Sequence, residues 1–280
     1  GQPPGVSIRE VRYTYDAGNR LIAQFQPNVV TAQAVGGASS TANFQTATGI
    51  SQSWTYDASG QLVSHTDGAG HVTRTWYNAA GQAVLNIDAE GYVTTWTRDA
   101  EGHVLVETRY ATKFTGDPTT ITTPASATWA ASANDRVTTS TYDLNGRVLT
   151  QTVKGVSYGA VAGNTGALSQ GVADATTTYA YDAAGNLLRR TDANGSVFSY
   201  TYDQAGHQLT QTGPAFTDYA GRVVQVTTTY VYNAQHDVVR ETRSGGPGGT
   251  DQVSTYRYDT VGRLVAKTNA AGVTTVMDHD

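Results

Sequence analysis

The sequence predicts an all-β fold in which tandem antiparallel β-hairpins join into a long, curled or spiral sheet. Three observations predict it: a composition rich in strand and turn formers, a Tyr-Asp-x-x-Gly motif that recurs along the chain, and a constant spacing between many of its copies. The 280 residues include 17 Tyr and 30 Gly. Tyr, Thr and Val favour the pleated surface of a strand, and Gly favours turns.

Composition also limits the classes of protein to consider. The net charge is −5, the 18 Lys and Arg residues are scattered, and there is no Cys. No basic block typical of nucleic-acid binding is present, and no apolar run approaches the roughly 20 residues that span a bilayer. We therefore expect no nucleic-acid partner, no membrane span and no disulfide. No signal-peptide pattern opens the sequence at Gly1, so we expect an internal segment of a longer protein.

The repeat is anchored on an acidic or amide residue. The ten anchors are Asp16, Asp57, Asn78, Asp99, Asp143, Asp182, Asp203, Asn233, Asp259 and Asp280. Eight are preceded by tyrosine, namely Tyr15, Tyr56, Tyr77, Tyr142, Tyr181, Tyr202, Tyr232 and Tyr258, and the other two by Arg98 and His279. Seven are followed three residues later by glycine, namely Gly60, Gly81, Gly102, Gly146, Gly185, Gly206 and Gly262. Asn19 and His236 replace that glycine in two units.

The spacing of the anchors defines a double-turn unit. Asp57, Asn78 and Asp99 are 21 residues apart, and a second Asp-x-x-Gly pattern begins ten residues after an anchor, as at Asp67. Asp or Asn at the first turn position accepts hydrogen bonds from backbone amides, and Gly at the fourth position adopts a positive φ without strain. Each unit is therefore expected to read strand, turn, strand, turn. Asn19 suits a positive φ, whereas His236 suits it less well, so we expect the Asn233 turn to deviate.

A second aromatic residue precedes most of the motifs. Seven anchors carry one three residues upstream: Tyr13, Trp54, Trp96, Tyr179, Tyr200, Tyr230 and Tyr256. Residues two apart on a strand lie on one face, so these rings and the motif tyrosines should form ladders across the sheet. Cross-strand packing is the favoured role. A platform that stacks on sugars is the alternative, with Trp54 and Trp96 as its candidate residues.

The whole of residues 1–280 is expected to form one repeat array whose extra residues fall at the second turn of a unit. The insertions cover approximately residues 27–50, 110–136, 154–175, 213–226 and 244–252. Turns of one kind lie along one edge of an antiparallel meander, so all five insertions should occupy one rim. Loops this long are usually functional or disordered. The segment with Phe114, Ile121 and Trp129 carries enough apolar surface to cover part of the sheet.

The motif resembles the YD repeat of the Rhs family. The resemblance lies in residues 56–63 (Tyr-Asp-Ala-Ser-Gly-Gln-Leu-Val), residues 258–265 (Tyr-Asp-Thr-Val-Gly-Arg-Leu-Val) and residues 191–197 (Thr-Asp-Ala-Asn-Gly-Ser-Val). In that family such repeats wind a β-sheet into a hollow shell. Bacterial members, including shell components of insecticidal toxin complexes, enclose a C-terminal toxin, and related repeats occur in wall-associated proteins and teneurins. The resemblance thus implies that this chain is part of a hollow shell.

The closing plug expected of the bacterial shells is missing from this sequence. They usually close with a plug segment that carries a P-x-x-x-x-D-P-x-G pattern and a self-cleavage aspartate, whereas the Asp117-Pro118 pair here lacks both the preceding Pro and the following Gly. No nucleophile, phosphate-loop or His-Glu-x-x-His motif is present, and each regularly placed Asp has a role in a turn. We therefore expect no catalytic residue, no metal site and no cofactor.

Three hypotheses about function follow. The first is a non-enzymatic structural segment of a large secreted or surface-displayed bacterial protein, whose sheet forms part of a shell around a C-terminal toxin or other cargo. The second is an extracellular adhesin or matrix protein that binds carbohydrate or cell-surface partners through aromatic ladders and rim loops. The third is a filament in which copies of the chain, or flanking repeats, pair through open sheet edges.

Overall fold

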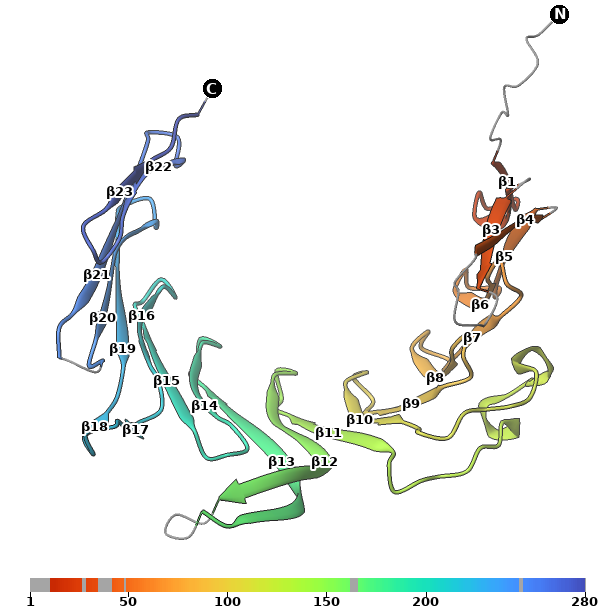
Figure 1. The fold of residues 1–280 in the computed structure, drawn as a ribbon, viewed down its shortest axis with the longest axis horizontal. Coiled ribbons are helices and arrows are strands. Elements are labelled where there is room, and N and C mark those ends of the chain that lie inside the picture. The colour runs from red at the N-terminus through yellow and green to blue at the C-terminus, as the bar shows by residue number, and fades with distance from the viewer. Residues whose placement is uncertain are drawn as a thin grey trace, which may run out of the picture. The chain divides into compact units, whose positions relative to one another are not determined.

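The structure, a computed structural model, describes residues 11–26, 29–34, 42–47, 49–161, 166–246 and 249–279. The chain divides into two units, residues 1–138 and 139–280. The described residues form 23 β-strands and two 3₁₀ turns. Each paired strand runs antiparallel to its partner, so the predicted all-β hairpin fold is confirmed (Figure 1). The last anchor, Asp280, lies outside the described residues.

The first unit is a meander in which β1, β2 and β5 to β10 pair in chain order. Its strands are β1 (Arg12–Tyr15), β2 (Leu21–Gln26), β3 (Val29–Ala34), β4 (Ala42–Ala47), β5 (Ile50–Tyr56), β6 (Leu62–Thr66), β7 (Val72–Tyr77), β8 (Ala83–Ile87), β9 (Val93–Arg98) and β10 (Val104–Arg109). The 3₁₀ turns are η1 (Pro118–Thr120) and η2 (Pro124–Ser126). Within the 27–50 insertion, β3 and β4 pair as a separate hairpin, and residues 27–28, 35–41 and 48 lie outside the described residues.

The second unit continues the same pattern, with β11 (Arg136–Tyr142) spanning the boundary. Its strands are β12 (Val148–Val161), β13 (Leu168–Tyr181), β14 (Leu187–Thr191), β15 (Val197–Tyr202), β16 (Gln208–Thr212), β17 (Phe216–Thr217), β18 (Val223–Val224), β19 (Thr227–Tyr232), β20 (Val238–Ser244), β21 (Gln252–Tyr258), β22 (Leu264–Thr268) and β23 (Thr274–Val276). Strands β12 to β16 and β19 to β23 pair in chain order, and β17 and β18 form a small separate hairpin.

Within each unit the two kinds of turn lie on opposite edges of the meander. In the second unit the anchored turns join β13 to β14, β15 to β16, β19 to β20 and β21 to β22, whereas the insertions fall between β12 and β13, β16 and β19, and β20 and β21. Because each strand reverses direction, the insertions of this unit share the edge opposite the anchored turns (Figure 1).

The insertion at residues 154–175 differs from a loop. Residues 154–161 extend β12 and residues 168–175 extend β13, so both strands have 14 residues. The two extensions pair from Val156 with Ala173 to Val161 with Leu168. Val and Tyr in these segments favour a strand, and no proline interrupts the backbone hydrogen bonding.

The insertion at residues 110–136 covers one face of the first unit. Trp76, Leu85, Ile87, Val93 and Ile121 form a buried cluster, with the first four on β7 to β9 and Ile121 in the insertion. Tyr110, Phe114, Ala127 and Trp129 of the insertion pack against it. A hydrogen bond also joins the insertion to the sheet, since Nη1 of Arg74 on β7 donates to the carbonyl of Thr119 at 2.8 Å. This cover gives the first unit its hydrophobic core.

The second unit lacks a comparable core. Among its described residues only Val224 and Ala266 are buried hydrophobic side chains. The motif tyrosines, such as Tyr181 and Tyr202, are half-buried, whereas their strand neighbours Ala180 and Thr201 are exposed. The sheet of this unit is therefore a single layer with a tyrosine face and an exposed face, on which small residues such as Ala180 alternate with arginines such as Arg189, and its cohesion depends on contacts between neighbouring strands.

Candidate functional site

The anchored turns share one hydrogen-bond pattern. At Asp143, the carbonyl accepts from Gly146 N at 3.0 Å, and the side-chain Oδ1 accepts from the amides of Asn145 and Arg147 at 2.9 and 3.0 Å. The glycine at the fourth position has φ of +75° at Gly146 and +98° at Gly185. A β-carbon is strained at such angles, which explains the glycine in the motif.

One turn was predicted to deviate, and that prediction is wrong. At Asn233 the amide of His236 donates to the anchor carbonyl at 3.1 Å, and Oδ1 accepts from Gln235 and Asp237 at 2.9 and 2.8 Å, as at other anchors. His236 adopts φ of +71°. The three hydrogen bonds around Asn233 therefore offset the strain of a non-glycine residue in the left-handed region.

At most anchors, the side chain four residues later binds the anchor side chain. Arg20 contacts Asp16 at 2.7 Å, Arg147 contacts Asp143 at 2.6 Å and Arg263 contacts Asp259 at 2.7 Å. His103 and His207 occupy the same position and contact Asp99 and Asp203 at 2.9 and 2.7 Å. These side chains can also contact the following repeat. For example, the guanidinium of Arg147 lies 4.7 Å from the centre of the Tyr181 ring.

The motif tyrosine joins each double-turn repeat to the repeat before it. Its hydroxyl donates to the backbone carbonyl five residues after the preceding anchor, as from Tyr202 to Leu187 at 3.0 Å. The other pairs are Tyr56 with Leu21, Tyr77 with Leu62, Tyr181 with Val148, Tyr232 with Gln208, and Tyr258 with Val238. Burial raises the pKa of Tyr181, Tyr202, Tyr232 and Tyr258. These phenols therefore stay protonated as donors at neutral pH.

The two repeats in which another residue replaces the motif tyrosine keep this contact. Arg98 Nε donates to the carbonyl of Ala83 at 3.3 Å, and His279 Nε2 lies 2.8 Å from the carbonyl of Leu264. Ala83 and Leu264 are each five residues after an anchor. What the position requires is therefore a long side chain with a terminal N–H or O–H donor rather than tyrosine itself.

The two candidate sugar-stacking residues lie on separate strands. Trp54 on β5 is half-buried, and its ring stacks on His65 with centroids 5.0 Å apart. Trp96 on β9 is half-buried, and its Nε1 donates to Glu107 at 3.0 Å. Four strand steps of about 4.8 Å separate the two strands, so the rings are roughly 19 Å apart and cannot stack on one sugar ring. Glycan stacking by these residues stays a prediction.

One group in the described part of the chain has metal-ligand geometry. The ligand atoms of Asp99, Glu101 and His103 all lie within 4.8 Å of one another, on a turn that is partly exposed. Asp99 accepts from the backbone amide of His103 at 2.8 Å, and its other oxygen lies 2.9 Å from His103 Nδ1. These contacts repeat the pattern of the other anchored turns and account for the proximity of Asp99 and His103.

Three features of the site were missed by the sequence analysis. The 213–226 insertion contains a further Asp-x-x-Gly turn, in which Asp218 accepts from Ala220 and Arg222. The motif pattern itself could have found it. The partner residue four positions after the anchor was visible as a recurrent Arg or His. The carbonyl that accepts from the tyrosine leaves no trace in the sequence, because every residue has one.

The anchored turns make a testable prediction about pH. Side-chain and then backbone hydrogen bonds from Arg147 hold the pKa of Asp143 below its usual value. A lowered folded-state pKa stabilises the fold above the unfolded pKa of about 3.9, and this stabilisation is lost as the pH falls through the folded pKa. We expect Asp143→Asn to lower the urea midpoint near pH 7 and to have little effect near pH 2.

Circular dichroism at several pH values would measure these midpoints. Asp143→Ala is the matched comparison, since it also removes the oxygen that accepts from the two amides and should lower the midpoint at both pH values. If Asp143→Asn lowered the midpoint equally near pH 7 and near pH 2, the ionised carboxylate would not be the stabilising group.

These observations define a tandem β-hairpin repeat protein: the turns recur, donor side chains join neighbouring repeats, and the strands form an antiparallel meander. Two overlapping matches to the RHS Repeat family model cover residues 172–197 and 181–215. Both matches begin and end within the double-turn units described above. The repeat that the motif predicted is therefore matched over residues 172–215 of this chain.

Solved structures add a weak likeness. A crystal structure of TcdB2-TccC3 without its hypervariable C-terminal region is 18% identical over 92% of this chain and 15% of that chain, with a TM-score of 0.31. A Tc holotoxin pore of Photorhabdus luminescens is 17% identical over the same shares, with a TM-score of 0.27. A porin-like protein from Bacteroides uniformis is 23% identical over 51% of this chain and 49% of that chain, with a TM-score of 0.26.

These TM-scores are too low to carry an argument about function. The chain spans about one seventh of the length of the first two solved chains. No curated protein matches its sequence. Among the described residues, no helix has the length and apolar character needed to cross a membrane.

Proposed function

We propose that this chain is a non-enzymatic wall segment of a large secreted or surface-displayed bacterial Rhs/YD-repeat protein, in which the sheet forms part of a shell around a C-terminal toxin or other cargo. The observation that carries the proposal is the contact between neighbouring double-turn repeats. At junctions between neighbouring repeats, a donor side chain contacts the carbonyl five residues after the preceding anchor, even where Arg98 or His279 replaces tyrosine. A wall must be continuous, and a ladder of identical contacts makes it so.

The composition of the second unit also supports a wall. Its sheet is one layer, with half-buried tyrosines on one face and exposed polar or small residues such as Ala180, Arg189 and Thr201 on the other. A sheet that separates two compartments needs no second layer of its own, whereas an independent globular domain would. The regular aspartates are engaged in turns, which favours a structural role over catalysis.

Limited proteolysis of the full-length protein would test this proposal. We expect the segment that follows the repeats to resist the protease while the wall is intact, and to become sensitive when the wall is weakened by Tyr202→Ala. Tyr219→Ala is the control, because Tyr219 is 97% exposed and its loss should leave the wall intact. Equal cleavage of the following segment in all three proteins would contradict encapsulation.

An adhesin that binds carbohydrate is the competing proposal. Trp54 and Trp96 are only half-buried, so each could offer part of a ring face. Its test is a glycan array with Trp54→Ala and Trp96→Ala, each checked for folding by circular dichroism. Binding by the wild-type chain that both folded variants lose would favour the adhesin, and absence of binding would leave the wall proposal as the better account.

A further inference from the structure

The outer part of the β12–β13 hairpin projects beyond the strands that flank it. We call its described residues, 156–161 and 168–173, the arm. A register shift between Val153 and Val156 marks its base, and Gly155 there has φ of +61°. Asp174 fixes this base, because its two oxygens accept from Lys154 Nζ at 2.7 Å and from the amide of Gly155 at 3.1 Å.

The arm is apolar and carries no charge. No Asp, Glu, Lys, Arg or His occurs between Lys154 and Asp174. Val161, Leu168 and Val172 are 67%, 64% and 68% exposed. Val161 pairs with Leu168, and Val172 is four residues further along β13, so the three side chains share one face.

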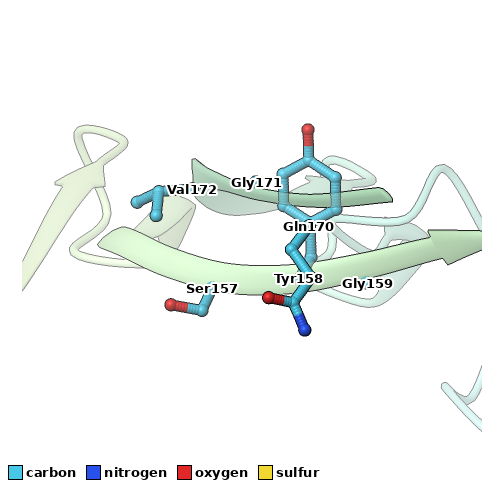
Figure 2. A pocket seen from close by; sticks show the side chains of 6 residues that line it. All are labelled: Ser157, Tyr158, Gly159, Gln170, Gly171 and Val172. Atoms are coloured by element: carbon cyan, nitrogen blue, oxygen red, sulfur yellow. The ribbon is translucent and has the colours of Figure 1, made fainter. Parts of the chain in front are cut away.

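The opposite face of the arm is built differently. The ring of Tyr158 lies over Gly171, as Figure 2 shows, where a β-carbon would approach the tyrosine Cζ to 2.7 Å. Ser157 points to the other side of the strand (Figure 2). The glycine thus lets Tyr158 pack down on its own hairpin, while the aliphatic face keeps its side chains in solvent.

The arm also has a free edge. Strand β14 pairs with β13 only from Thr178 to Tyr181, and no described residue pairs with the outer edge of residues 168–173. Native edge strands are usually protected by a charge, a proline or a bulge. Residues 168–173 contain none of these, since the nearest bulge and charges are at the base. A two-stranded ribbon is marginal in water, so a third strand would stabilise it.

We propose that the arm is a self-association surface, in which the outer edge of β13 pairs antiparallel with the same edge of a second copy across a twofold axis. Identical edges related by a twofold axis are complementary by symmetry, since each residue that donates in one copy meets its acceptor in the other. The pairing makes a four-stranded sheet and brings Leu168 and Val172 of one copy next to those of its mate.

Charge favours a second copy over an unrelated partner. The chain has a net charge of −5, so two copies repel each other over most of their surfaces. The arm avoids this repulsion because it is uncharged, and the Lys154–Asp174 ion pair at its base is already neutral as a pair. A partner of opposite charge would need no such uncharged surface.

Sedimentation equilibrium over a concentration series would test the proposal. We expect the wild-type chain to form a dimer, and the double substitution Leu168→Lys with Val172→Lys to weaken the dimer by at least about tenfold, since edge lysines block strand addition. Val273→Lys is the matched control, because Val273 is an aliphatic residue of the same unit that is 60% exposed. Its dimerisation should equal that of the wild type.

A mixing experiment separates strand pairing from general stickiness. A chain with Leu168→Glu and Val172→Glu should also be monomeric alone, but should form a heterodimer with the lysine variant, because opposite charges then meet across the edge. A monomeric wild type at every concentration, equal dimerisation of the double variant, or mass that grows without limit would each overturn the twofold pairing. Circular dichroism of each variant checks that the fold is intact.

Discussion

Replacing Ile87 with alanine should lower the free energy of unfolding of the first unit by about 2–5 kcal/mol. Ile87 has no exposed surface, and it lies between Leu85 and Val93 in the cluster that the 110–136 insertion covers. The substitution removes buried methylene groups and leaves a cavity that two layers of close-packed neighbours can fill only in part.

Tryptophan fluorescence isolates this effect. All four tryptophans, Trp54, Trp76, Trp96 and Trp129, lie in residues 1–138, so the signal reports the first unit alone. A urea titration followed by tryptophan emission should shift to lower urea for Ile87→Ala. Leu188→Ala in the second unit, where Leu188 is 40% exposed, is the control and should leave that transition in place. Equal transitions for Ile87→Ala and wild type would contradict the core as described.

Removing three ladder hydroxyls together should destabilise the second unit by about 2–4 kcal/mol, at about 1 kcal/mol for each hydrogen bond. The substitutions are Tyr181→Phe, Tyr202→Phe and Tyr258→Phe, which keep the rings and remove donors to the carbonyls of Val148, Leu187 and Val238. Because this unit is a single layer with little core, the loss should be felt by the whole meander rather than by one strand.

Amide hydrogen exchange would measure this loss, since the second unit has no tryptophan. Exchange should accelerate across β12 to β16 and β19 to β23 in the triple variant, while the first unit stays unchanged. Tyr219→Phe removes a hydroxyl from a side chain that is 97% exposed and should leave exchange as in the wild type. If amide exchange accelerated only at the three substituted positions, the hydroxyls would not join neighbouring repeats.

Much of the fold was predictable because its turns are local. The anchor, the glycine and the hydrogen bonds between them lie within five residues of one another, so the motif specifies each turn wherever it occurs. The 213–226 insertion shows the strength of that signal, since Asp218 and Gly221 form the same turn within a segment that was assigned only as an insertion. His236 shows its limit, because the prediction weighed one residue's preference against positive φ and omitted the hydrogen bonds around it.

The fate of the insertions was less predictable because their partners are distant in the chain. Both 154–175 and 110–136 were expected as insertions at a second turn, and only 110–136, with Phe114, Ile121 and Trp129, was expected to cover part of the sheet. In the structure the first is a long hairpin, held by strand pairing from Val156 to Val161, and the second is a cover held by Ile121 on β7 to β9. Strand propensity indicated a hairpin at 154–175 only weakly. Nothing in the sequence predicted which face of the sheet Ile121 covers.

The sequence by itself determined the Tyr-Asp-x-x-Gly unit, its antiparallel hairpins and their order along the sheet. Tertiary structure decided which carbonyl each tyrosine reaches and that Arg98 and His279 make the same contact. It also decided that, among the described residues, only the first unit has a covered core. The physical reason is range. A turn is encoded by side chains that meet within one hairpin, whereas a ladder contact needs a backbone carbonyl of the preceding unit, which any residue can supply.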